Sequence, residues 1–195
     1  METQLLRTDT EEGFNKALEL AVAQLRQGEV VAVPTETVYG LAANALELAS
    51  VEKIFTAKDR PAQNPIIVHV SSESMARDCV ARWPESAAAL AKAFWPGPLA
   101  LVLSKADSIP DNVVAGGTTV GVRWPSHPFM QKLITACGFP LAAPSANLSN
   151  HISPTSAEHV RSQMKGRIPL IIDGGPAQVG IESTVVDLSV DSVRV

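Results

Sequence analysis

The chain has 195 residues, of which 46% are hydrophobic and 18% charged, and its formal net charge is −4. This length favours a single domain over residues 1–195, and the apolar fraction fits a globular protein with its own core. The negative charge gives no overall attraction to nucleic acid, although a local basic groove is compatible with it.

The beginning of the chain and its cysteines point to an ordinary intracellular protein. Residues 1–12 are polar and acidic and lack the basic start and apolar run of a signal peptide. No apolar stretch is long enough to span a membrane. Cys79 and Cys137 lie outside any CxxC, and no Cys or His spacing matches a zinc site. We therefore expect a cytoplasmic protein with buried thiols, no membrane contact and no metal held by the protein.

Helices and strands are predicted to alternate along the chain. Apolar residues at helical spacing predict the helices, and short apolar runs bounded by Gly or Pro predict the strands. In chain order we expect a helix over 11–27, a strand over 30–33, a helix over 49–57, a strand over 66–70, helices over 73–81 and 85–94, strands over 99–103 and 118–123, a helix over 127–136, a strand over 141–143, a helix over 156–164, and strands over 169–172 and 184–188. This alternation predicts an α/β fold with an open, mixed sheet.

The loops that follow the predicted strands are the place to look for a site. The 14 prolines and 12 glycines lie mostly at strand ends, which is where open α/β sheets bind ligands. The motifs GxGxxG, GxxxxGK[ST], GxSxG and HExxH are all absent from the sequence. This disfavours a Rossmann dinucleotide site, a P-loop, an ordinary serine hydrolase and a zinc protease.

The first candidate is PTETVYG, residues 34–40, directly after the strand over 30–33. It supplies the hydroxyls of Thr35 and Thr37, the carboxylate of Glu36 and the phenol of Tyr39. A capped turn before a helix explains such residues equally well.

The second candidate is the segment over 57–65, where Pro61 and Pro65 stiffen a loop that carries Lys58, Arg60 and Asn64. A fork-shaped guanidinium and a compact ammonium suit a polyphosphate. The alternative is that both cations interact with the last carbonyls of the preceding helix.

The third candidate is Arg123, at the end of a predicted strand. A buried arginine needs an anionic partner, which could be Asp173 or a substrate carboxylate. In the fourth candidate, Ser145 and Asn147 follow the strand over 141–143 as small donors suited to phosphate or adenine, with an ordinary turn as the alternative.

The fifth candidate is the glycine-rich segment over 173–184. Its glycines let the backbone approach a ligand closely, although a hairpin turn would need them too. Single histidines such as His69 show no metal-ligand spacing.

Six motifs in this order carry a family resemblance. They are PTETVYGLAANA, AKDRPAQNPIIVHV, WPGPLALVL, VGVRWPSHP, PLAAPSANLSNHISPT and IIDGGPAQVGIESTVVD. From about residue 28 to residue 187 the sequence resembles the YrdC-like threonylcarbamoyl-AMP synthases. The resemblance implies a twisted open α/β sheet with flanking helices and a large, concave, basic cavity.

The resemblance also implies a reaction. L-threonine and bicarbonate give N-carboxy-threonine, whose carboxylate attacks the α-phosphorus of ATP. Pyrophosphate leaves, and the nucleotidyl transfer yields threonylcarbamoyl-AMP for the modification of tRNA by downstream transfer proteins. Mg²⁺ is expected on the triphosphate, and contact with tRNA is compatible with the family.

Residue roles follow from the same resemblance. The positions expected to hold threonine are Thr35, His69, Arg123 and Ser183. Those expected to hold ATP are Lys58, Arg60, Asn64, Ser145, Asn147 and either Thr118 or Thr119. Lys58 and Arg60 would neutralise the charge that develops during transfer. Glu36 and Asp173 are candidates for a general base, with nothing that selects one. Longer family members continue into an Arg-Pro-Gly segment whose arginine reaches ATP, and the sequence printed here ends at Val195.

Two alternatives remain at this level. One is a carbamoyl-adenylate-forming domain like that of hydrogenase-maturation carbamoyltransferases, although the acylphosphatase and zinc-finger-like segments of those chains are not in this sequence. The other is an RNA-binding module without catalysis, which the net charge of −4 and the aromatic content of 5% disfavour.

Overall fold

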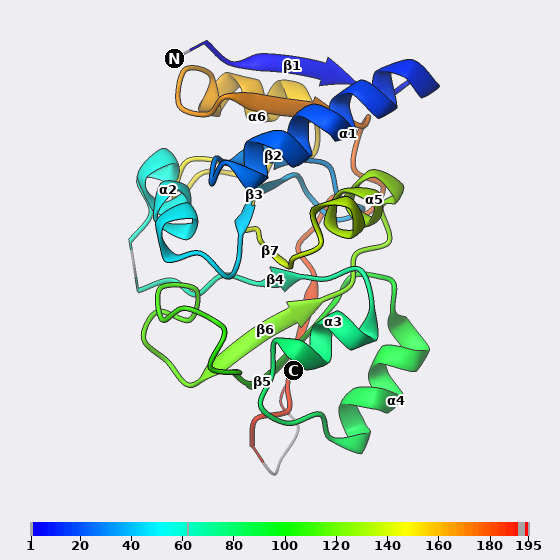
Figure 1. Ribbon diagram of the computed structural model, residues 1–195, viewed down its shortest axis with the longest axis vertical. Helices are drawn as coiled ribbons and strands as arrows, with labels where there is room; N and C mark the ends of the chain where they lie inside the picture. Colours follow the sequence, from blue (N-terminus) through cyan, green and yellow to red (C-terminus); the bar gives the residue numbers. More distant parts are fainter. Residues whose placement is uncertain (1, 62, 191–193, 195) are drawn as a thin grey trace.

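The computed structural model describes residues 2–61, 63–190 and 194 of the chain. Within these residues, helices and strands alternate as Figure 1 shows. In chain order the elements are β1 Gln4–Arg7, α1 Glu11–Arg26, β2 Val31–Val33, β3 Gly40–Asn44, α2 Leu48–Lys58, β4 Val68–His69, α3 Glu73–Asp78, α4 Glu85–Phe94, β5 Leu99–Ser104, β6 Thr119–Arg123, α5 Pro128–Cys137, β7 Leu141–Ala142, α6 Ala157–Met164, β8 Leu170–Asp173 and β9 Thr184–Asp187.

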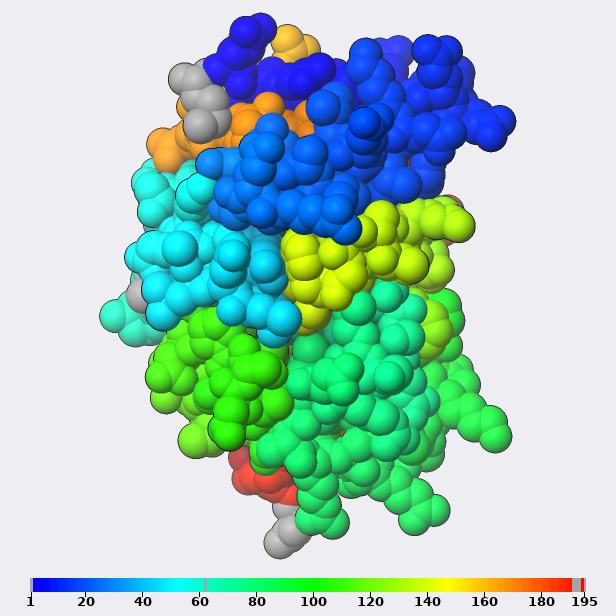
Figure 2. All heavy atoms as spheres, viewed as in Figure 1, coloured from blue at the N-terminus to red at the C-terminus, as the bar shows by residue number. Residues whose placement is uncertain are grey.

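The strands form one mixed sheet in the order β1-β8-β2-β3-β7-β4-β6-β5-β9. The pairs β1/β8, β2/β8, β4/β6 and β5/β9 are parallel, and the pairs β2/β3, β3/β7, β4/β7 and β5/β6 are antiparallel. Figures 1 and 2 show α1 and β1 at one end of the long axis and α4 near the other, so the sheet runs along that axis. The predicted open, mixed α/β sheet is confirmed.

Alternate residues of the central strands face two separate cores. On β2, Val31 and Val33 pack with one core and Ala32 with the other. α1 and α5 cover the first of these faces, and α2 and α6 contribute to the second. The alternation follows from the two-residue period of a strand. Because both faces are covered, the central strands are mostly apolar and are buried on both sides, as the short apolar runs predicted.

Two strands were not predicted from the sequence. β1 is a four-residue edge strand that is only partly buried, and its sequence has no marked alternation. β3 has the sequence GLAAN, which lacks the β-branched and aromatic residues that identify strands. The predicted helix over 73–81 ends earlier, at Asp78. Among the described residues, the helices are all too short or too polar to cross a membrane.

Candidate active site

The PTETVYG segment is a loop between two buried strands of the sheet. It joins β2 to β3 and does not lead into a helix, so the alternative of a helix cap is wrong. Neighbouring segments hold its backbone: the N–H of Val179 donates to Glu36 O at 2.8 Å, that of Gly180 to Thr37 O at 3.0 Å, and that of Tyr39 to Pro154 O at 2.8 Å. The loop is therefore fixed from both sides.

Tyr39 is a structural anchor of this loop. Its hydroxyl donates to Gly175 O at 2.6 Å and accepts from the N–H of Gly174 at 3.2 Å. Burial raises the pKa of Tyr39 to about 12, so the phenol stays protonated. A Cβ on Gly174 would lie 2.6 Å from Pro34 Cγ. Gly174 therefore packs closely against Pro34, and a close approach of this segment to a ligand stays a prediction.

Arg123 at the end of β6 finds its anionic partner in the PTETVYG loop. Arg123 Nη2 lies 2.7 Å from Glu36 Oε1, and both side chains are almost completely buried. The two groups meet outside the angles of a linear hydrogen bond. Asp173, the protein partner considered from the sequence, instead accepts from the N–H of Gly175 at 3.1 Å. The sequence named Glu36 as a site candidate but did not pair it with Arg123, because the two residues lie far apart in the chain.

The ion pair sets the protonation of its surroundings. Burial alone would raise the pKa of Glu36, but the positive charge of the adjacent Arg123 outweighs this effect and lowers the pKa below its usual value. His69 on β4 lies beside Arg123 on the paired strand β6. Burial, together with the nearby Arg123 charge, lowers the pKa of His69 to about 3, so the imidazole is neutral near pH 7. Its Nδ1 is buried without a hydrogen-bond partner.

These groups line a small polar hollow of about 60 Å³, enclosed by the PTETVYG loop and the ends of several strands. The residues predicted to hold threonine all line it, namely Thr35, His69, Arg123 and Ser183. Ser145 lines it as well, and so do Thr37 and Glu182, to which the sequence assigned no ligand contact. Both lie inside recognised motifs, and Glu182 directly precedes Ser183, so the sequence offered a signal for them. ATP exceeds this volume, so the large concave cavity stays a prediction.

Lys58 connects the end of α2 to the loop that follows β7. The side chain is 1% exposed, and its Nζ donates to the carbonyl oxygens of Ser145 and Asn147. Burial lowers the pKa of Lys58 to about 8, and the neighbouring Arg60 adds to this effect. The predicted nucleotide ligands Lys58, Ser145 and Asn147 are thus brought together, and the lysine holds the loop in place.

The remaining predicted nucleotide ligands are less closely gathered. Arg60 Nη2 donates to Pro65 O at 3.1 Å, and its Nε is buried without a partner. Asn64 is exposed on the same loop, of which Ala62 lies outside the described residues. Thr118 is exposed just before β6, at the opposite end of that strand from Arg123, and Thr119 begins the strand. Thr118 and Thr119 do not line the polar hollow.

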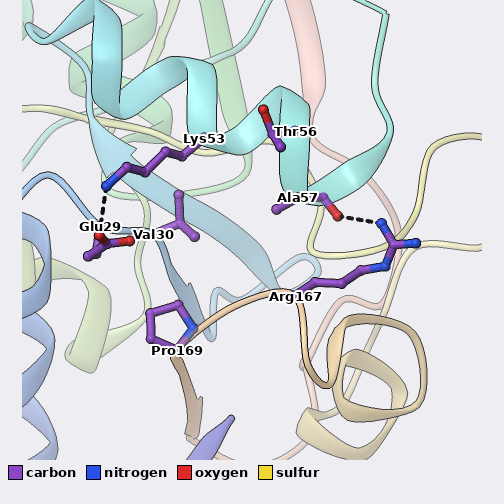
Figure 3. A pocket seen from close by; sticks show the side chains of 7 residues that line it. All are labelled: Glu29, Val30, Lys53, Thr56, Ala57, Arg167 and Pro169. Carbon is purple, nitrogen blue, oxygen red and sulfur yellow. Dashed lines mark hydrogen bonds and ion pairs between the residues drawn. The ribbon is translucent and has the colours of Figure 1, made fainter. Parts of the chain in front are cut away.

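A larger hollow of about 460 Å³ lies between α2 and the start of β8 (Figure 3). Its charged groups already have partners: Lys53 Nζ lies 2.7 Å from Glu29 Oε1, and Arg167 Nη1 donates to Ala57 O at 3.3 Å. None of the predicted site residues lines it. Because its polar atoms are paired within the protein, we place the site at the smaller polar hollow.

The fold and the site define an α/β protein with a mixed sheet and a small polar hollow at the strand ends, lined by a buried, ion-paired arginine. The family model Sua5_yciO_yrdC, described as "Telomere recombination", matches residues 23–195, and the chain belongs to this family.

The chain is also similar to named relatives. It is 52% identical over 172 residues to the threonylcarbamoyl-AMP synthase of Bacillus subtilis, covering 88% of this chain and 50% of the relative. It is 50% identical over 172 residues to that of Pyrococcus abyssi, with coverages of 88% and 51%. The chain thus spans about half the length of these curated relatives. The crystal structure of P. abyssi Sua5 complexed with L-threonine superimposes with a TM-score of 0.93 at 46% identity, over 99% of this chain and 56% of that one.

Proposed function

We propose that this chain catalyses the formation of threonylcarbamoyl-AMP from ATP, L-threonine and bicarbonate. The observation that carries the proposal is the polar hollow, which gathers Thr35, His69, Arg123 and Ser183 from four separate segments. The relatives named threonylcarbamoyl-AMP synthase and the Sua5 complex with L-threonine support it. The expected role in tRNA modification, with downstream transfer proteins, tRNA contact and a cytoplasmic location, belongs to the same proposal.

In the amino-acid half of the site, the protein positions a substrate that brings its own nucleophile. Arg123 is buried and lines the hollow, so its guanidinium can donate to a ligand carboxylate. His69 is neutral, so it can exchange a hydrogen bond with the ligand without adding charge. A buried arginine and an uncharged imidazole suit the binding of a small carboxylate.

In the nucleotide half, the bond changes need no protein nucleophile. A carbamate oxygen of N-carboxy-threonine forms a bond to the α-phosphorus of ATP, the bond from that phosphorus to the bridging oxygen breaks, and pyrophosphate carries the electron pair away. Lys58 and Arg60 would stabilise the negative charge on the phosphates. Glu36 is not assigned as a general base, because its carboxylate is paired with Arg123. Asp173 is not assigned as one either, because it does not line the hollow.

Mg²⁺ on the triphosphate remains part of the proposal only as a companion of ATP. The described residues contain no group of three or more His, Cys, Asp or Glu side chains placed to hold a metal ion.

The proposal is tested by incubating the protein with ATP, bicarbonate and L-threonine and measuring pyrophosphate and the adenylate product. Pyrophosphate release that requires both threonine and bicarbonate is the expected result. Release that depends on carbamoyl phosphate instead would favour a carbamoyl-adenylate-forming domain. Salt-sensitive RNA binding without any threonine-dependent release would favour an RNA-binding module.

A further inference from the structure

The end of α6 contacts two backbone segments that carry the nucleotide half of the site. α6 and α2 contribute to the same core, which brings the end of α6 close to the end of α2 and to the loop after β7. Gln163, in the last turn of α6, reaches the loop after β7. Arg167, four residues later, reaches the end of α2. Neither side chain lines the polar hollow, and neither takes part in the proposed bond changes.

The amide of Gln163 holds the loop after β7 much as a neighbouring strand would. Its Oε1 accepts from the N–H of Leu148 at 3.2 Å, and its Nε2 donates to Ile152 O at 3.4 Å. These contacts fix the stretch of the loop that follows Ser145 and Asn147. Ser145 has separate support from a β-bridge to the start of β3. Gln163 therefore acts on the part of the loop beyond Asn147, away from the part that lines the hollow.

The end of α2 has a backbone conformation that needs support from outside the helix. Asp59 directly follows Lys58, the last residue of the helix, and has a φ of 50°. A left-handed residue is a common way to end a helix, but it favours glycine, and a residue with a Cβ adopts it at an energetic cost. Because Asp59 lies between Lys58 and Arg60, it sets the direction in which the chain carries these two cations.

Arg167 supplies this support from a distant part of the chain. Its Nη1 lies 2.8 Å from Asp59 Oδ2 and donates to Ala57 O at 3.3 Å, so it bridges the last turn of α2 and the residue after it. Figure 3 shows the guanidinium reaching the end of α2 from the loop after α6. Both side chains of the ion pair are partly exposed, so the pair adds little to overall stability. Its effect is on the geometry of the turn.

We propose that Gln163 and Arg167 are positioning residues for ATP, and this inference rests on the proposed function. Each holds one of the two segments that supply the nucleotide ligands. Lys58 joins these segments through the carbonyls of Ser145 and Asn147, so a shift of one segment is passed to the other. Because a misplacement of about 1 Å is enough to weaken the contacts of a bound substrate, loss of either support weakens ATP binding without removing a ligand contact.

The test is calorimetric titration of variants with ATP and, separately, with L-threonine. Arg167→Met removes the ion pair with Asp59, and Gln163→Leu removes both loop contacts at similar volume. We expect each variant to raise the dissociation constant of ATP by about three- to tenfold and to leave that of threonine within about twofold of the wild-type value. The midpoint of urea unfolding should fall only slightly, because the contacts that are lost are partly exposed.

The variant Asp59→Gly separates support of the turn from a general structural role of Arg167. It removes the acidic partner, but glycine adopts the left-handed turn without strain. ATP affinity should therefore stay near the wild-type value in Asp59→Gly, and adding Arg167→Met to this variant should weaken ATP binding by less than about twofold. The same loss from Arg167→Met with Asp59 and with glycine at this position would overturn the role of the arginine in the turn.

Arg161→Gln is the matched control on the same helix. Arg161 is exposed and pairs with Glu158 at 3.8 Å, so this variant should leave both dissociation constants unchanged. Wild-type ATP affinity in Arg167→Met or Gln163→Leu, or an equal loss of ATP and threonine affinity, overturns the inference and leaves the proposed function intact. A folded wild-type protein that binds no ATP contradicts the proposed function and the inference with it.

Discussion

Arg123 and Glu36 form the ion pair on which the candidate site depends. The pair joins the end of β6 to the loop after β2, and it excludes Glu36 from contact with a ligand because Arg123 lies on the side of the hollow. Such a pair fixes the orientation of its side chains but adds little net stability, since desolvation offsets much of the attraction between buried charges. Stability is lost when one partner is removed, because the other charge then stays buried without a partner.

Arg123→Ala should therefore impair both folding and binding. It leaves the carboxylate of Glu36 buried without its partner, which we expect to lower the free energy of unfolding by about 3–5 kcal/mol. Threonine affinity should fall far more than ATP affinity. Urea unfolding and calorimetric titration with each ligand measure the two effects.

The double variant Glu36→Leu/Arg123→Met is the control for this prediction. It removes both charges and should regain much of the lost stability without regaining threonine binding. Equal losses of threonine and ATP binding in Arg123→Ala would show that the arginine is only structural.

The pH dependence of stability follows from His69, Glu36 and His127. Burial lowers the pKa of His69 to about 3 and also lowers that of His127, so the unfolded chain takes up these protons below about 6.5 while the folded protein resists them. The pKa of Glu36 is also lowered, so its contribution is lost below about 4.5. Because the unfolded state binds more protons over this range, stability falls as pH falls.

We accordingly expect the free energy of unfolding, measured in urea between pH 7 and pH 4, to decrease steadily from about pH 6.5 downwards. His69→Gln should make the decrease in the free energy of unfolding shallower above pH 4.5. The part of the decrease that His127 causes should remain. A profile that is flat from pH 7 to pH 5 would contradict the burial of a neutral His69.

At the scale of elements, α2 and the loop after β7 behave as one unit because Lys58 joins them. The sequence indicated a cation for phosphate at this position. The structure shows that the same ammonium first satisfies two backbone carbonyls in a buried setting. An anchoring role and a role toward the triphosphate are compatible, since a lysine has three hydrogens to donate.

Lys58→Met should loosen this connection. The carbonyls of Ser145 and Asn147 lose their donor, and we expect a loss of about 1–3 kcal/mol in the free energy of unfolding, together with weaker ATP binding. Lys53→Met on the same helix is the control. Lys53 pairs with Glu29 at the surface, so its loss should cost no more than about 1 kcal/mol and leave ATP binding unchanged. Similar effects of the two variants would contradict the anchoring role.

Element prediction succeeded where the local sequence carries the periodicity and failed where pairing alone makes the strand. α1 and α4 begin at the predicted residues because their apolar spacing and flanking residues define them locally. β3 exists because β2 and β7 pair with its two edges. The backbone hydrogen bonds that stabilise it come from residues remote in the chain, so its sequence alone could not identify it.

The molecule as a whole is held together by two cores on opposite faces of one sheet. Leu133 on α5 is fully buried in the core that α5 shares with α1. Leu133→Ala should lower the free energy of unfolding by about 2–5 kcal/mol through the cavity that it leaves. Threonine affinity of the folded variant should not change, because Leu133 does not line the polar hollow.

Leu48→Ala, at a residue that is 59% exposed, is the comparison for this prediction and should shift stability by less than about 0.5 kcal/mol. Urea titration followed by circular dichroism measures both variants. An equal effect of the two substitutions would contradict the assignment of Leu133 to the core.

The sequence by itself determined the α/β class, most of the elements and the segments that meet at the site. Those features depend on local periodicity and on motifs that lie within single loops. Only the tertiary structure decided that Glu36 is the partner of Arg123 and that Lys58 anchors a backbone loop. The reason is physical: the capacity of a polar group to bind a ligand depends on which of its hydrogen bonds the fold has already used, and these partners lie far away in the chain.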